Sequence, residues 1–118
     1  MEINIEIIIN KLEYKVNELT IRNAKLEKLG IIKDRLEATY RCELRKELLQ
    51  LALNNTNARG HEKIAQLRLN RDLAKIRYYL MKSSIENIKF EIEVLRSMLI
   101  WLRVEFSVLK DKEVTWLN

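Results

Sequence analysis

Basic side chains recur at every seventh position along the C-terminal half of the chain, and such a row could bind phosphate. The row consists of Arg68, Lys75, Lys82, Lys89, Arg96, Arg103 and Lys110. Seven residues are close to two turns of an α-helix, so these cations would follow one line along a helix. A line of cations can neutralise the phosphates of a nucleic acid, or it can pair with acids on a neighbouring helix.

The basic excess is greatest in residues 41–82, which carry ten Lys or Arg against four Asp or Glu. Acidic partners are scarce there, so we expect an anion-binding surface. From Lys89 onward acids are frequent, and we expect interhelical pairing. Tyr78 and Tyr79 could stack on bases or simply pack. The candidate DNA-binding residues are Arg41, Arg45, Lys46, Arg59, Lys63, Arg68, Arg71 and Lys75.

The sequence offers no convincing catalytic or metal-binding constellation. His61 is the only histidine, and "HEKIA" (residues 61–65) lacks the second histidine of a zinc-binding helix. Glu91 and Glu93 are two residues apart and would diverge on a helix. Cys42 is the only cysteine and has no histidine nearby in sequence to activate it. We therefore expect a non-enzymatic protein with no cofactor and no bound metal.

A long helix over residues 62–110 would position the basic row. Apolar residues alternate there at spacings of three and four, the a and d positions of seven heptads, with Arg71 as the one charged exception. This a/d row is Ile64, Leu67, Arg71, Ala74, Tyr78, Met81, Ile85, Ile88, Ile92, Leu95, Leu99, Leu102, Phe106 and Leu109. A second row nearly opposite holds Leu69, Leu73, Ile76, Leu80, Phe90, Val94, Trp101, Val104 and Val108. A helix with two apolar sides needs two partners, which we expect to be a helix of the same chain and a second subunit.

Two shorter patterns precede this helix. A heptad repeat runs through residues 3–26 and consists of Ile5, Leu12, Leu19 and Leu26. Four residues after each of the first three stand Ile9, Val16 and Asn23. The alternating isoleucines at its start would also suit a strand, but the heptad spacing favours a helix. We expect a break at Gly30, a second helical stretch over residues 31–53, and a turn at "NNTNARG", residues 54–60.

The sequence thus predicts an all-α protein, a long helical hairpin or coiled coil that assembles as a homo-oligomer. It would contain two to three helices, the last about 45–50 residues long. The sequence contains no proline and only two glycines, so it has few residues that interrupt a helix. Residues 1–29 would be an amphipathic oligomerisation helix, and residues 31–118 a helical hairpin. The expected subunit contacts are Ile5, Leu12, Leu19, Leu26, Leu69, Ile76, Phe90 and Trp101.

The same sequence favours a cytoplasmic protein. Charged residues interrupt every apolar stretch before it reaches the length of a membrane span, and the N-terminal segment lacks a signal-peptide pattern. A single cysteine is typical of a reducing compartment.

The segment from Arg35 to residue 106 resembles small phage proteins encoded among DNA recombination genes. The layout is similar to that of the UvsY family of recombination mediators: a helix with bases in its later turns ("ELRKEL", residues 43–48), a loop with Gly60, then a long helix that begins with basic and Asp residues ("RLNRD", residues 68–72). The resemblance implies a homo-oligomeric helical protein that binds single-stranded DNA and helps a recombinase replace single-strand binding protein. It places DNA contacts at Arg45 and Lys46. Glu47, where another base would be expected, and the apolar segment 1–26 depart from the family pattern.

Three functions therefore remain open from the sequence. The first is a single-stranded DNA-binding recombination accessory or mediator protein whose binding is sequence-tolerant. The second is a phage-encoded inhibitor that binds a host nucleic-acid enzyme through the same surface. The third is a structural coiled-coil adaptor. The clustering of bases around residues 41–82 favours the first over the third.

Overall fold

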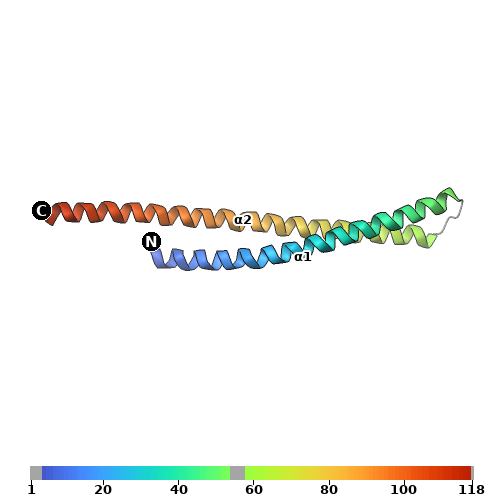
Figure 1. Ribbon diagram of the computed structural model, residues 1–118, viewed down its shortest axis with the longest axis horizontal. Helices are drawn as coiled ribbons and strands as arrows, with labels where there is room; N and C mark the ends of the chain where they lie inside the picture. The colour runs from blue at the N-terminus through green and yellow to red at the C-terminus, as the bar shows by residue number, and fades with distance from the viewer. Residues whose placement is uncertain (1–3, 54–57, 118) are drawn as a thin grey trace. The chain divides into compact units, whose positions relative to one another are not determined.

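The chain forms two long α-helices in a computed structural model, α1 (Ile5–Ala52) and α2 (Ala58–Leu117) (Figure 1). The structure describes residues 4–53 and 58–117, with side chains for residues 4–53 and 59–110. The prediction of an all-α chain is confirmed, with two helices of 48 and 60 residues. The second is longer than expected because it begins before and ends after the predicted limits.

The helix boundaries differ from the expected ones at two places. α1 continues without a break through Gly30, so residues 3–26 and 31–53 belong to one helix. Of the expected turn, residues 54–57 lie outside the described residues, and residues 58–60 are the start of α2. At the N-terminus, the backbone N–H of Glu6 donates a hydrogen bond to Asn4 Oδ1 at 2.9 Å. Asn4 therefore caps α1, and the Glu6 carboxylate lies where the helix dipole favours negative charge.

Gly30 of α1 lies against an aromatic side chain of α2. A Cβ atom at this position would lie 3.4 Å from Cε2 of Tyr78 on α2. The Lys33 ammonium, one turn further along α1, lies 4.8 Å from the centre of the same tyrosine ring. The glycine that we expected to end a helix is therefore a contact point for an aromatic side chain.

The two helices contribute to two compact units. One unit, here the hairpin unit, is Arg22–Ser84, and the other, here the terminal unit, combines residues up to Ile21 with residues from Ile85. The helices are antiparallel within each unit, as ion pairs such as Lys63–Glu43 and Lys15–Glu91 illustrate. The hairpin unit buries Tyr40, Ile64 and Ala74, and the terminal unit buries Ile8, Ile85, Ile88 and Ile92.

The predicted a/d row of α2 is confirmed over most of its length. Every member from Ile64 to Leu102 is buried or half-buried, whereas Phe106 and Leu109 are exposed. The second apolar row is exposed in all its members, so α1 does not cover it.

The expected contact row of α1 is correct only in part. Its heptad leucines from Leu12 onward are half-buried, but Ile9, Val16 and Asn23 are exposed. The row is completed instead by Ile8, Lys15, Arg22 and Leu29. Lys15 Nζ lies 2.6 Å from Glu91 Oε2, and the Arg22 guanidinium donates a hydrogen bond to Ser84 Oγ. Polar groups can occupy these positions because α2 provides a hydrogen-bonding partner for each.

The single chain leaves much apolar surface in contact with water. Its accessible surface is 9902 Å², whereas a compact monomer of this mass, 14.1 kDa, exposes roughly 6,700 Å². Among the residues whose side chains the structure describes, seven hydrophobic residues are buried, and none of their side chains is more than 98% covered. Within the described residues, neither helix contains a stretch apolar enough to cross a membrane.

Candidate nucleic-acid interface

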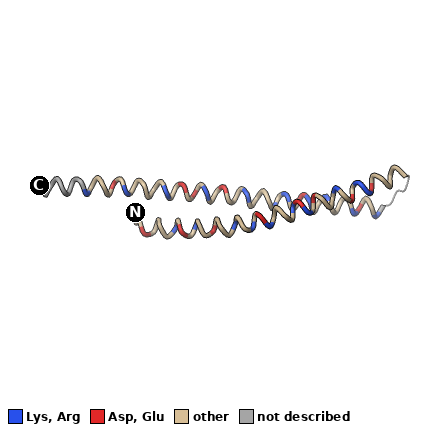
Figure 2. Tube along the Cα trace, in the orientation of Figure 1, with Lys and Arg blue, Asp and Glu red and all other residues tan. Residues whose placement is uncertain are grey.

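Charge is distributed unequally between the two units. The hairpin unit contains fifteen Lys and Arg against seven Asp and Glu, a formal charge of +8. The terminal unit contains seven Lys and Arg against ten Asp and Glu, a formal charge of −3. Figure 2 shows the basic residues crowded along both helices of the hairpin unit. The net charge of +5 therefore hides a strongly basic unit, which raises the local concentration of anions near it.

Tyr40 lies at the centre of the basic residues of the hairpin unit. It is buried at 7% exposure and contacts two guanidinium groups of α2. The Arg71 Cζ atom is 4.3 Å from the ring centre and the Arg68 Cζ atom 5.7 Å. Arg68 Nε also donates a hydrogen bond of 3.2 Å to the tyrosine hydroxyl. The ring thus fixes two of the predicted DNA-binding cations by cation–π contacts.

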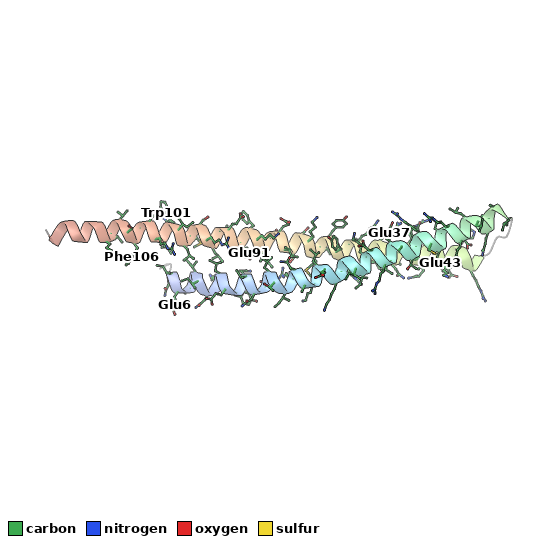
Figure 3. The ribbon with its side chains drawn as sticks, viewed as in Figure 1. Glu6, Glu37, Glu43, Glu91, Trp101 and Phe106 are labelled. Carbon is green, nitrogen blue, oxygen red and sulfur yellow. The ribbon has the colours of Figure 1, made fainter. Side chains whose placement is uncertain are left out.

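Glu37, a residue of α1 that is labelled in Figure 3, collects three of the predicted cations. Arg41 Nε is 2.9 Å from Oε1, and both Arg71 Nε and Lys75 Nζ are 3.6 Å from Oε2. Desolvation acts to raise the pKa of Glu37, but the hydrogen bond from Arg41 and the three cations lower it below its usual value. One carboxylate among so many cations leaves an excess of positive charge.

Glu43 gathers a second pair of cations. Lys63 Nζ lies 3.1 Å from Oε2 and Lys46 Nζ 3.4 Å from Oε1. The hydrogen bond from Lys63 is the main cause that lowers the pKa of Glu43. Glu37 precedes Tyr40 by three residues and Glu43 follows it by three, so the two carboxylates flank the tyrosine on opposite sides of the contact row.

The structure therefore divides the predicted DNA-binding set. Arg41, Arg71 and Lys75 meet at Glu37, and Lys46 and Lys63 meet at Glu43. Arg45 and Arg59 are exposed. Arg45 follows Arg41 by four residues and so lies on the same side of α1.

Two residues that the sequence did not place in the site extend the Glu37 side. Lys82 follows Lys75 by one heptad, and Tyr79 lies between them at helical spacing. Tyr79 is 56% exposed, whereas Tyr78 is half-buried and meets the Tyr79 ring edge-on at 5.4 Å between centres. The spacing of Lys82 already signalled its place in the basic row. We call the resulting surface the basic edge: Arg41, Arg45, Arg68, Lys75, Lys82 and Tyr79.

The basic row continues beyond the hairpin unit without acidic partners in the described part of the chain. Lys89, Arg96, Arg103 and Lys110 are exposed and, like Lys82, form no ion pair with any described residue. Pairing of the later members with acids of another subunit stays a prediction.

The predicted subunit contacts fall into two groups. Leu12, Leu19 and Leu26 are half-buried on the row of α1 that packs against α2, whereas Ile5, Leu69, Ile76, Phe90 and Trp101 are exposed. Among the described residues no group of His, Cys, Asp and Glu could hold a metal ion.

No protein-family description, curated protein or solved structure matches the chain.

Proposed function

We propose that this chain is a non-enzymatic protein that binds single-stranded DNA along the basic edge and acts as an accessory or mediator protein in recombination. The observation that carries the binding proposal is the formal charge of +8 on the hairpin unit. The mediator role rests on the resemblance of the segment from Arg35 to recombination mediators.

The chemistry of the basic edge suits a flexible single strand. Its cations lie at one- and two-turn spacings, so they can contact successive phosphates of a backbone that follows the helix. Tyr79 offers an exposed ring for base stacking between Lys75 and Lys82, and stacking tolerates any base. Glu37 holds Arg41 and Lys75 in place while neutralising only one of the surrounding charges. We infer binding that is sequence-tolerant and sensitive to salt.

The test is fluorescence anisotropy of a labelled 30-residue oligothymidine, titrated with protein at several salt concentrations beside a duplex of the same length. We expect tighter binding to the single strand, with affinity falling steeply as salt rises. Binding that is absent at low salt would refute the proposal.

A matched pair of variants locates the binding site. Lys82→Glu and Lys89→Glu reverse exposed charges one heptad apart on the same row, but Lys82 lies in the basic hairpin unit and Lys89 in the acidic terminal unit. We expect Lys82→Glu to weaken DNA binding about tenfold, since it removes one phosphate contact and adds a repulsion. Lys89→Glu should bind like the wild type. Equal losses in the two variants would argue against a site on the basic edge.

Self-association as a homo-oligomer is the second function that we propose, and the exposed second apolar row favours it. Leu69, Ile76, Phe90 and Trp101 are between 51% and 67% exposed. Large apolar faces in contact with water are typical of interaction surfaces. Light scattering should give a mass that is a multiple of 14.1 kDa, and a monomer at all concentrations would exclude assembly.

A further inference from the structure

The terminal unit carries an aromatic face with an acidic rim. Phe90, Val94 and Trp101 are exposed at 67%, 43% and 65%, and they line one hollow on α2 with Glu93 and Glu105. Figure 3 shows Trp101 pointing away from α1. At roughly 100° per residue, the two glutamates fall on either side of the apolar residues. Neither glutamate has a cationic partner in the described part of the chain. We call this surface the acidic face.

The hairpin unit carries a groove of the opposite charge. Ile32 and Leu36 of α1 and Leu73 of α2 line it together with Arg77. Ile32 and Leu73 are 48% and 41% exposed. Lys28 and Arg35 lie four and three residues from Ile32 and so flank it on α1. Arg77, Lys28 and Arg35 form no ion pair with any described residue. We call this surface the basic groove.

The basic groove and the basic edge are separate surfaces. Ile32 precedes Glu37 by five residues, which places the two side chains on different sides of α1. A molecule in the groove therefore leaves Arg41, Lys75 and Lys82 accessible.

The two surfaces match in chemistry. Aromatic and branched side chains of the acidic face can fill an apolar groove, while the glutamates of the rim meet the cations of the groove. DNA does not suit the acidic face, because Glu93 and Glu105 repel phosphate. An anionic membrane surface is unsuitable for the same reason. A partner for the acidic face must present apolar residues with a basic rim, and this chain itself has that surface.

We propose that the acidic face of one copy packs in the basic groove of a second copy. The contact joins two different surfaces, so each copy can donate one and accept one. This inference specifies the self-association proposed above and rests on it.

Complementation between two broken variants tests the pairing. Trp101→Asp places a charge on the acidic face, and Ile32→Asp does the same in the basic groove. Both residues are exposed, so the fold of each chain should survive, which circular dichroism verifies. Leu49→Asp is the control, because Leu49 is 64% exposed and belongs to neither surface.

Each broken variant alone should be monomeric by light scattering at a concentration where the wild type and Leu49→Asp assemble. The two variants mixed should form a 1:1 complex of twice the 14.1 kDa chain mass, because one intact face meets one intact groove. A monomeric wild type would overturn the self-association and this inference together. An assembling wild type whose broken variants do not complement each other, or assemble alone, would overturn the face-to-groove pairing only.

Exchanging the charges of the acidic face and the basic groove is a second, independent test of their pairing. Reversing the three cations of the groove together (Lys28→Glu, Arg35→Glu and Arg77→Glu) should weaken assembly at least threefold, and adding Glu93→Lys and Glu105→Lys to the same chain should restore it. Failure of the fivefold variant to recover would overturn the proposed charge pairing.

Discussion

Individual side chains in the hairpin unit have both a packing and an electrostatic role. Tyr40 is buried between Arg68 and Arg71, and its hydroxyl accepts a hydrogen bond from Arg68. The tyrosine therefore supports the fold and also keeps two cations at the surface of α2. Such a residue should respond differently to loss of its hydroxyl and loss of its ring.

Tyr40→Phe should cost about 0.5–1.5 kcal/mol of unfolding free energy, because one hydrogen bond is lost while both cation–π contacts remain. Tyr40→Ala should cost about 3–5 kcal/mol, because the buried ring is lost as well. Urea unfolding followed by circular dichroism measures both. Equal costs would mean that the ring contributes little to stability.

Acid should weaken the hairpin unit through its two carboxylate clusters. The pKa values of Glu37 and Glu43 are lowered in the folded chain. Their contribution to stability is therefore complete above the pKa of an unfolded glutamate, about 4.3, and is lost as pH falls through the lower folded values. In the Glu37→Gln variant, the melting temperature should fall less steeply as the pH is lowered than it does in the wild type. Parallel curves for the variant and the wild type would assign the acid sensitivity to other groups.

The two helices show how far the buried row of a helix can be predicted from sequence. Period-seven spacing located the contact row of α2, because burial on one side of a helix must follow its turn. The α1 row was displaced by one position at Ile9, Val16 and Asn23, because Lys15 and Arg22 pack against α2 through Glu91 and Ser84. A polar residue in a contact row depends on a partner far along the chain, and spacing alone does not reveal that partner.

The site was predictable to a similar extent. The number of basic residues in the segment 41–82 located the basic unit. The division of these cations into two clusters, one on each side of Tyr40, follows instead from where Glu37 and Glu43 lie around the helix. The importance of these two acids comes from their position. A count of charges treats all acids alike.

Gly30 gives an element-scale prediction. Its Cβ would be in ordinary contact with the Tyr78 ring at 3.4 Å, and alanine is the better helix former. Gly30→Ala should therefore stabilise α1 by about 0.5–1 kcal/mol. Thermal unfolding should show a higher midpoint. A lower midpoint would mean that the methyl group displaces Tyr78.

Across the whole molecule, DNA binding and self-association should respond differently to salt. The basic edge binds through phosphate contacts, so its affinity should fall steeply between low and physiological salt. The face-to-groove contact is mainly apolar, and screening removes only its rim contribution. Light scattering and anisotropy in the same salt series should show assembly persisting where DNA is released. Loss of both at the same salt concentration would mean that one surface serves both.

The last described side chains of α2 have a consequence for the lifetime of the chain in the presence of proteases. Every side chain over residues 103–110 is exposed, including Phe106 and Leu109, which continue the row that α1 covers earlier. A helical segment without a packing partner opens at little free-energy cost. Trypsin should therefore cut first after Arg103 and Lys110, well before it cuts at Arg71, whose side chain is only 19% exposed against α1.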